Sequence, residues 1–463
     1  MSLLVMKFGG TSVGSVEAIE SLASITREHL KTWDQAVVVV SAMSGVTDLL
    51  IKSARAAAEG DRTTYHEIAQ KLRERHAATL AELVGQDEAA SQKIEQLLEE
   101  FELLCHSVGV LGEASPRAMD AISGMGERMS IHLVAATLRA RGIPSEAIEA
   151  TELILTTSDF GNAVPIQPQT RQRTQARLRP LLEQGIVPVV TGFIGASESG
   201  ATTTLGRGGS DYSGAIIGAA LDADEVAIYT DVDGVMTTDP RLVSDARVID
   251  VLSYNEMSEL AYFGAKVLHP RAVRPVVERG IPLRIRNTFN ASHMGTLVVQ
   301  DVPPSDRPVK AVTSIKNMSL ITVEGRGMIG VPGVAARTFG AVASADANVL
   351  MISQASSEQS ICFVVPVSSS KQVLQALELG LHHELQRRDV DRISARDEVV
   401  IVTAVGAGMR ETPGVASQVF GALAERQINV IAIAQGSSES SISLVVNAAD
   451  ADEAVRAIHS LTA

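Results

Sequence analysis

The chain has 463 residues, enough for roughly three domains of about 150 residues each. Its composition, 45% hydrophobic and 20% charged, is typical of globular domains with substantial cores. A net charge of −14 and a pI near 5.3 argue against a surface that binds nucleic acid or an anionic membrane.

The cysteines and the hydropathy of the chain indicate in which cellular compartment the protein is expected. Cys105 and Cys362 are far apart in the sequence, which predicts reduced thiols in a cytoplasmic protein. No apolar run approaches the roughly 20 residues of a membrane span, so we expect no membrane partner. The first apolar run starts at the N-terminus, and we expect no signal peptide.

The N-terminus predicts a strand, a glycine turn and a helix. An apolar run leads through Lys7 into Gly9 and Gly10, and helical periodicity starts near Val16. Glycines let backbone N–H groups approach an anion, and a helix start directs its positive end to the same point. The segment lacks the GxxxxGK[ST] and GxGxxG patterns, so taken alone it also fits an ordinary turn.

A second strand and a helical hairpin follow. The β-branched run at 36–41 predicts a strand buried on both faces. The small-residue loop at 41–48 stands where open parallel sheets bind ligands. Residues 61–111 have helical periodicity broken at Gly85, which predicts a hairpin of two helices. Three histidines of this hairpin lack ligand-like spacing and are expected to be solvated: His66, His76 and His106.

Two further segments place charged groups at helix starts. Glu127 opens an amphipathic helix, where a carboxylate usually serves as a dipole or capping group but could face a ligand amine. Residues 185–195 predict another buried strand. The glycine-rich loop that follows at 205–214 carries a guanidinium, a hydroxyl and a carboxylate, supplied by Arg207, Ser210 and Asp211.

The last part of this half holds two more predicted strands. Residues 227–234 predict a strand that ends in an acidic turn, for which ordinary turn chemistry is the simpler interpretation. Residues 281–288 alternate as a half-buried strand. Three glycine-rich strand ends together with Lys7 and Lys266 favour one phosphate site over unrelated turns.

Beyond a proline-rich linker at 303–308 the chain repeats itself. Matched residues recur at a constant offset of 81, from Gly325 and Gly406 onward. Each repeat predicts strand, glycine loop, helix, strand, serine-rich turn, strand and helix. A tandem pair can be purely structural, but Gln354 and Gln435 at matched strand ends favour a small-ligand pocket.

These motifs together resemble the aspartokinases over essentially the whole chain. The residues that carry the resemblance are KFGGTS at 7–12, GE at 126–127, LGRGGSDYS at 205–213, YTDV at 229–232 and FGAKVLHP at 263–270. The resemblance implies an α/β amino-acid-kinase fold over 1–302, an open, mainly parallel sheet between helix layers. Two α+β ACT domains should follow at 313–390 and 398–463. In this family the second ACT domain is commonly inserted into the first, so we expect C-terminal residues, near 443–447 or beyond, to complete ACT domain 1.

The implied reaction is phosphoryl transfer from ATP to the β-carboxylate of L-aspartate, with Mg²⁺ held mainly by phosphates and water. This is the first step of the branch that leads to lysine, threonine and methionine. The homoserine dehydrogenase half of bifunctional relatives is expected to be absent. By resemblance, Lys7 and Asp211 are catalytic. The residues expected to bind aspartate are Thr47, Glu127, Arg207 and Ser210. Those expected to bind ATP are Lys7, Gly9, Gly10, Thr230, Asp231, Arg241 and Lys266. No protein metal ligand is expected.

One position departs from the family pattern. Met236 stands where relatives usually carry tyrosine, so adenine packing there would rest on a thioether. The QxSSE segments that start at Gln354 and Gln435 resemble those of threonine-sensitive aspartokinases, so the effector is expected to be threonine, with lysine as second choice. The physical reason agrees, because glutamine amides can donate to and accept from a hydroxy amino acid. The residues expected to be regulatory are Asn348, Gln354, Asn429 and Gln435. A homodimer or higher oligomer through the ACT domains is expected.

Two other functions remain open. A kinase for another acidic metabolite, such as glutamate or acetylglutamate, would not be expected to pair Glu127 with Arg207 as a clamp for an α-amino acid. An amino-acid-sensing regulatory subunit with an inactive kinase half would require loss of Lys7, Asp211 or Arg207, and all three are present.

Overall fold

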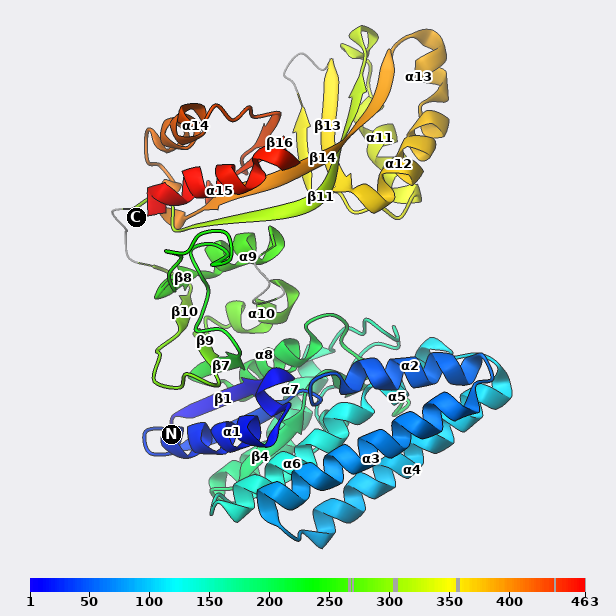
Figure 1. The fold of residues 1–463 in the computed structure, drawn as a ribbon, viewed down its shortest axis with the longest axis vertical. Helices are drawn as coiled ribbons and strands as arrows, with labels where there is room; N and C mark the ends of the chain where they lie inside the picture. Colours follow the sequence, from blue (N-terminus) through cyan, green and yellow to red (C-terminus); the bar gives the residue numbers. More distant parts are fainter. Residues whose placement is uncertain (265–267, 269, 303–306, 355–358, 437–438, 463) are drawn as a thin grey trace. The chain divides into compact units, whose positions relative to one another are not determined.

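The computed structural model describes residues 1–264, 268, 270–302, 307–354, 359–436 and 439–462 (Figure 1). It divides into two units. Unit 1 comprises Met1–Val235, Val248–Tyr254 and Val267–Val302, and unit 2 comprises Met236–Arg247, Asn255–Lys266 and Pro303–Ala463. The sequence predicts a continuous catalytic domain over 1–302. Two segments within that range instead pack as part of unit 2.

Unit 1 contains an eight-stranded sheet in the order β3-β4-β2-β1-β7-β9-β10-β8. Its strands are β1 (Leu3–Phe8), β2 (Gln35–Val40), β3 (Ser145–Ile148), β4 (Val187–Thr191), β7 (Glu225–Thr230), β8 (Val251–Ser253), β9 (Leu283–Asn287) and β10 (Thr296–Val299). Every pairing is parallel except that of β9 with β10. The predicted open, mainly parallel sheet is therefore confirmed. A small antiparallel pair, β5 (Ile194–Ala196) and β6 (Thr202–Thr204), forms a second sheet.

Helices cover the sheet in layers (Figure 1). The helices of unit 1 are α1 (Val16–His29), α2 (Val46–Ala58), α3 (Arg62–Val84), α4 (Glu88–Leu111), α5 (Pro116–Ser123), α6 (Met125–Ala140), α7 (Gln167–Glu183), α8 (Gly209–Leu221) and α10 (Pro270–Val277). A main core joins alternate residues of β1 (Leu4, Met6 and Phe8) to α1, α3 and α6. Lys7 points to the other face, where α8 approaches so closely that a Cβ on Gly214 would lie 3.1 Å from the Lys7 Cβ.

The predicted helical hairpin is confirmed as α3 and α4, joined at Gly85. One detail of its prediction is wrong. His76 is fully buried rather than solvated, and its Nδ1 lies 2.7 Å from the Leu72 carbonyl oxygen. The hairpin's helical period places His76 on the inner face, among Leu72, Leu80 and other apolar residues.

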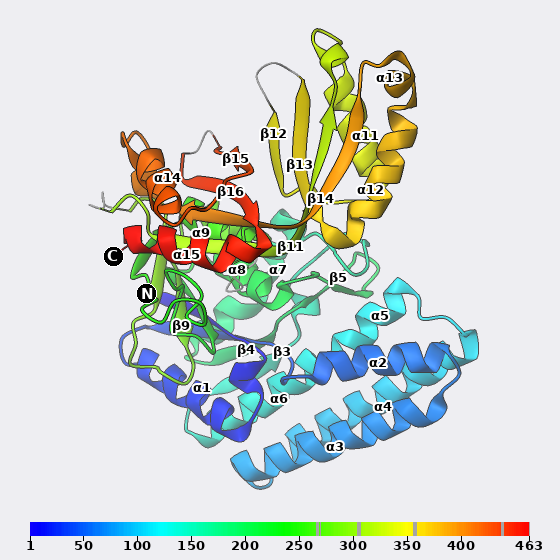
Figure 2. The same cartoon turned by 45° about the horizontal axis from the view of Figure 1, so that its top comes forward.

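Unit 2 contains a six-stranded antiparallel sheet in the order β12-β13-β11-β14-β16-β15 (Figure 2). Its strands are β11 (Ala311–Glu324), β12 (Met351–Gln354), β13 (Ser360–Pro366), β14 (Arg392–Val405), β15 (Ala432–Ala434) and β16 (Ser441–Asn447). Its helices are α9 (Tyr254–Tyr262), which begins at the last residue of a unit 1 segment, α11 (Val334–Ser344), α12 (Val367–Gly380), α13 (His382–Arg387), α14 (Val415–Glu425) and α15 (Ala451–His459). The repeated strand–helix order predicted from the 81-residue offset is confirmed.

The exchange between the two repeats differs from the expected one. We expected C-terminal residues near 443–447 to complete the first repeat, but β16 pairs with β14 and β15. The exchange of strand segments between the two repeats is made instead by the long central strands β11 and β14. The start of β11, at 311–315, pairs with the end of β14, and the start of β14, at 392–396, pairs with the end of β11. Each repeat thus borrows one strand segment from the other.

The segments of 1–302 that belong to unit 2 are bonded into it. The Val312 N–H donates to the Thr237 carbonyl at 2.8 Å, and the Thr237 hydroxyl lies 2.9 Å from His459 Nε2 in α15. The side chain of Glu256 in α9 is fully buried, and its Oε1 accepts from the Ala407 N–H at 2.6 Å. These bonds explain why the segments group with the repeats despite their place in the sequence.

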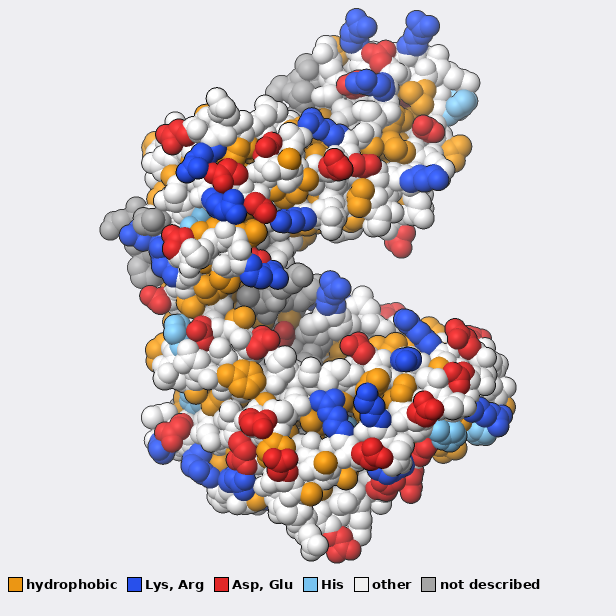
Figure 3. All heavy atoms as spheres, in the orientation of Figure 1, with side chains coloured by type: hydrophobic (Ala, Val, Ile, Leu, Met, Phe, Trp, Pro, Cys, Tyr) orange, Lys and Arg blue, Asp and Glu red, His pale blue; other side chains and the backbone are white. Residues whose placement is uncertain are grey.

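Lysines and arginines are interspersed with aspartates and glutamates on the face shown in Figure 3. None of the helices that the structure describes has both the length and the apolar character needed to cross a bilayer.

Candidate functional site

The carboxyl ends of β1 and β2 meet the start of α8 around an ion pair. Lys7 Nζ lies 2.6 Å from Asp211 Oδ1, and the lysine side chain is only 8% exposed. In the sheet order, β2 lies on one side of β1 and β7 on the other, which is where open α/β sheets form their ligand crevice. The two predicted catalytic residues are therefore in contact, with a lysine held by a carboxylate at this crevice.

The glycine turn follows directly from β1. The Gly9 N–H donates to the Tyr229 carbonyl at 3.0 Å, so this amide is already used within the protein. The Gly10 N–H has no acceptor among the described residues. A Cβ on Gly10 would lie 3.2 Å from the Ala42 carbonyl oxygen, which shows how closely the turn approaches the loop after β2. Of the two predicted backbone donors, Gly10 is the one available to an anion.

Glu127 lies in the first turn of α6 and is 3% exposed. Its Oε2 has no hydrogen-bond partner among the described residues. Burial raises the pKa of Glu127 to about 8, although a hydrogen bond from the Ala42 backbone and the charge of Lys7 partly oppose the rise. A buried carboxyl with an unused oxygen is costly unless a donor arrives, and an ammonium group would satisfy it.

One pocket of about 300 Å³ gathers the predicted substrate residues. Its lining includes Lys7, Thr47, Glu127, Arg207, Ser210 and Asp211. The exposed guanidinium of Arg207 and the buried carboxyl of Glu127 give this pocket groups for both a carboxylate and an amine. The sequence prediction missed Ser41 and Phe193, which also line it. Ser41 could have been found from its position at the end of β2.

A second pocket, of about 510 Å³, contains the glycine turn and is named the glycine-turn pocket. It adjoins the first pocket and shares Ser41, Thr47, Glu127 and Ser210 with it. It contains four of the predicted ATP-binding residues: Gly9, Gly10, Thr230 and Asp231. Thr11 and Asp48 line it too and were not predicted. Asp48 lies in the first turn of α2. It could have been found in the sequence as the acidic residue at the end of the loop after β2.

Lys7 lines the first pocket, and neither pocket lining includes the two remaining predicted ATP-binding residues. Arg241 belongs to unit 2, and its guanidinium, 85% exposed, pairs with Asp239 at 2.6 Å. Lys266 lies outside the described residues. Met236 is half-buried and also belongs to unit 2. The ATP role of these residues stays a prediction.

Unit 2 holds a third pocket, of about 410 Å³, at the second repeat. Gln435 lines it together with Gly414, Glu411 and Glu439. Its first-repeat counterpart Gln354 ends β12 in an exposed position, and residues 355–358 lie outside the described structure. Asn348 and Asn429 are exposed and precede β12 and β15. Of the four predicted regulatory residues, only Gln435 lines this pocket.

Two family models match the chain. Residues 2–287 match the amino acid kinase family, and residues 321–380 and 402–461 match an ACT domain family. The chain is 35% identical to an aspartate kinase of Pseudomonas fluorescens over 99% of this chain and 97% of that one. It is 38% identical to bifunctional aspartokinase/homoserine dehydrogenase 2 of Arabidopsis thaliana, covering 98% of this chain and 50% of that protein. The chain thus spans about half the length of its bifunctional relatives.

The fold agrees with a solved relative. The structure matches aspartokinase III of Escherichia coli in complex with aspartate and ADP, with a TM-score of 0.81, 31% identity and 99% coverage of both chains. The family match and the shared fold together define the class of this protein, an amino acid kinase. Within that class, the chain belongs to the aspartokinase family.

Proposed function

We propose that this protein is an aspartate kinase, which transfers the γ-phosphoryl group of ATP to the β-carboxylate of L-aspartate. The observation that carries the proposal is the pocket that places Arg207 and Glu127 beside the Lys7–Asp211 pair. Arg207 would hold the α-carboxylate of aspartate in a bidentate pair, and Glu127 would accept its α-ammonium. The β-carboxylate would then face Lys7 and the glycine turn.

The transfer requires positioned charge more than covalent chemistry. An oxygen of the β-carboxylate forms a bond to the γ-phosphorus as the bond to the β,γ-bridging oxygen breaks, and ADP leaves. Lys7 would stabilise the negative charge on the transferring group, while Asp211 holds the lysine in place. The Gly10 N–H would donate to a phosphate oxygen, and Thr47 and Ser210 would hydrogen-bond aspartate.

The pockets fit a nucleotide-borne Mg²⁺ ion. Asp48 and Asp231 line the glycine-turn pocket, where their carboxylates would face the ion. This donor set suits an ion carried mainly by phosphates and water. Mg²⁺ would supply positive charge that neutralises the phosphates during transfer.

A substrate panel tests the proposal. ADP release should be fast with aspartate and near background with glutamate or N-acetylglutamate. Comparable turnover with glutamate or acetylglutamate would assign the chain to another acidic substrate. No turnover with any of them would favour an amino-acid-sensing subunit. Arg207→Lys should raise the KM for aspartate strongly and leave the KM for ATP nearly unchanged, because an ammonium cannot make the bidentate pair.

The regulatory ligand is proposed to be an amino acid bound at the ACT repeats, with threonine as the first candidate. The amide of Gln435 in the pocket of the second repeat can both donate to and accept from a hydroxyl group. Lysine is a second candidate because Glu411 and Glu439 line the same pocket and could accept its ammonium. A related aspartokinase III structure was solved with lysine and aspartate.

Separate titrations of kinase activity with threonine and with lysine distinguish the two ligands. Gln435→Ala and Gln354→Ala should each weaken inhibition by the true effector. Inhibition by lysine alone would replace threonine in the proposal. Inhibition that neither substitution alters would move the effector site elsewhere. We also propose assembly into a homodimer or higher oligomer through the ACT repeats, which sedimentation of the full chain would measure.

A further inference from the structure

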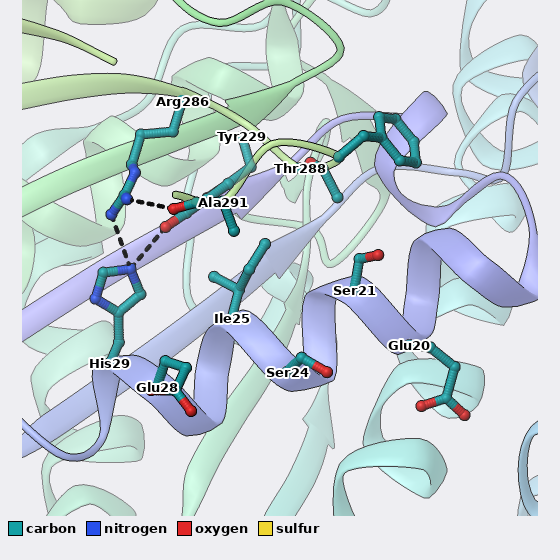
Figure 4. Close-up of a pocket in the computed structure, with 11 residues that line it drawn as sticks. Glu20, Ser21, Ser24, Ile25, Glu28, His29, Tyr229, Arg286, Thr288 and Ala291 are labelled. Carbon is teal, nitrogen blue, oxygen red and sulfur yellow. Dashed lines mark hydrogen bonds between the residues drawn. The ribbon is translucent and has the colours of Figure 1, made fainter. Parts of the chain in front are cut away.

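Figure 4 shows a cavity of about 540 Å³. It lies on the face of the unit 1 sheet that packs against α1, opposite to the face of Lys7. The strand register places Phe8, Tyr229 and Arg286 side by side across β1, β7 and β9, on the face that packs against α1. The cavity opens between this row and the outer part of α1. Its lining residues are Glu20, Ser21, Ser24, Ile25, Glu28, His29, Tyr229, Arg286, Thr288, Phe289 and Ala291.

Three polar side chains converge at one end of the cavity (Figure 4). His29 Nε2 lies 2.6 Å from the Tyr229 hydroxyl and 3.3 Å from Arg286 Nη1. A guanidinium can only donate, so Nε2 is the acceptor and the imidazole is neutral. Burial and the nearby Arg286 lower the pKa of His29 to about 4, in agreement with this assignment.

Arg286 therefore supplies the positive charge of this cluster. Its Nη2 donates to the Ala291 carbonyl at 2.9 Å, and no carboxylate pairs with it among the described residues. Its Nε is buried and has no partner there. The two acidic residues of the lining are paired elsewhere, Glu20 with Arg141 and Glu28 with Lys31. A half-buried guanidinium without a counter-ion favours an anionic ligand.

Apart from Glu20 and Glu28, the other walls are apolar or weakly polar. Ile25 is buried, while the Phe289 ring is 55% exposed. Ser24 of α1 adds a hydroxyl group at an exposed position. A mostly apolar cavity of this size with a few convergent polar groups is typical of sites for small organic ligands. We propose that this cavity is a second ligand site, which binds a small organic carboxylate with an apolar body.

The site has a physical connection to the glycine turn. The carbonyl of Tyr229 accepts the Gly9 N–H, and the Thr288 hydroxyl donates to the Ser12 hydroxyl at 2.6 Å. Tyr229 and Thr288 both line the cavity. A ligand that contacts their side chains thus touches two residues that hold the turn from behind.

The test titrates the full chain with 4-fluorobenzoate and follows the fluorine NMR signal. We expect one site with a Kd on the order of 1 mM, as is usual for a ligand of this size. Arg286→Met removes the cation, and Ser24→Trp fills the cavity from an exposed helix position. Each should weaken binding at least tenfold. Glu17→Trp, exposed on the same helix outside the cavity lining, is the matched control and should bind as the parent does.

Two comparisons locate and classify the site. Arg207→Met alters the substrate pocket and should leave the affinity for 4-fluorobenzoate unchanged, while 4-fluorobenzyl alcohol should bind the parent at least tenfold more weakly. The proposal is overturned if no binding occurs up to about ten times the expected Kd. It is equally overturned if affinity follows Arg207 rather than Ser24 and Arg286, or if the neutral alcohol binds as well as the acid.

Discussion

Lys7 combines burial, charge and position at a strand end. Lys7→Ala should lower kcat by on the order of 10²–10³-fold, because removing one preorganised charge contact typically costs this much. The fold should survive, since the side chain lies beside the crevice rather than in the main core. Steady-state kinetics and circular dichroism measure the two effects.

Lys31→Ala is the control for Lys7→Ala. Lys31 pairs with Glu28 at the surface, where such pairs contribute little, and its loss should leave kcat unchanged. A Lys7→Ala enzyme with activity within a few-fold of the parent would remove Lys7 from the phosphoryl-transfer step.

Glu127 predicts a specific dependence on pH. Its pKa is raised from 4.5 to about 8, so the folded protein binds a proton that the unfolded chain has lost over this interval. The free energy of unfolding should therefore fall as pH rises from 4.5 to 8. Glutamine does not ionise, so the free energy of unfolding of Glu127→Gln should not fall in this way. The melting temperature of the variant should therefore exceed that of the parent by an amount that grows up to pH 8. A constant difference between the two melting temperatures would contradict the raised pKa.

The same carboxyl should control the binding of aspartate. An ammonium group requires the charged form of Glu127, so the KM for aspartate should decrease as pH rises from 6.5 to 8. In Glu127→Gln the KM should be high and nearly independent of pH over this range. The KM for ATP, measured at saturating aspartate, is the internal control. A pH-dependent aspartate KM that persists in the variant would assign the titration to another group.

At the scale of elements, the close approach of α6 to the loop after β2 sets the position of Glu127. A Cβ on Gly126 would lie 2.6 Å from the Ala42 Cβ and 3.2 Å from Val46 Cγ1. Gly126→Ala should displace the start of α6, at a cost of about 1–3 kcal/mol in stability, and raise the KM for aspartate. Thermal unfolding and kinetics measure both effects.

Gly421→Ala on α14 is the matched helix control, because its added methyl group would meet no atom within 4 Å. Helix propensity predicts a gain of up to about 1 kcal/mol for this change. If Gly126→Ala behaved as Gly421→Ala does, close packing at α6 would not position Glu127.

The sequence predicts elements well where local physics decides them. The β-branched run of β2, the glycine turn and the 81-residue repeat each give a local signal, and all three are seen in the structure. The row of Tyr229 and Arg286 depends on the register between β7 and β9, which the sequence does not reveal. The burial of His76 and the use of the Gly9 N–H within the protein likewise depend on tertiary neighbours. The side chains that line the pocket of about 300 Å³ were therefore largely predictable, while the cavity behind the turn was not.

At the scale of the whole molecule, the chain passes repeatedly between the two units. It leaves unit 1 after Val235, returns at Val248, leaves again after Tyr254 and returns at Val267. The first segment that belongs to unit 2, Met236–Arg247, begins a few residues after Asp231, which lines the glycine-turn pocket. We therefore expect a change within the ACT repeats to reach the pocket of about 510 Å³ through the continuous backbone.

The Thr237–His459 contact tests this connection. Burial lowers the pKa of His459, so its imidazole is neutral at pH 7 and Nε2 can accept the Thr237 hydroxyl at 2.9 Å. Thr237→Val keeps the shape but leaves this nitrogen without a donor, at a cost of about 1–3 kcal/mol. The segment Met236–Arg247 should then be bound less tightly to α15. Inhibition by whichever of threonine and lysine is the effector should require several-fold more of it, while uninhibited activity stays near that of the parent.

Thr403→Val, which removes a 2.9 Å hydroxyl contact with Ser443 inside the sheet, is the matched control and should leave the inhibition curve nearly unchanged. Identical inhibition curves for the parent and Thr237→Val would show that the segment Met236–Arg247 does not transmit inhibition by the effector.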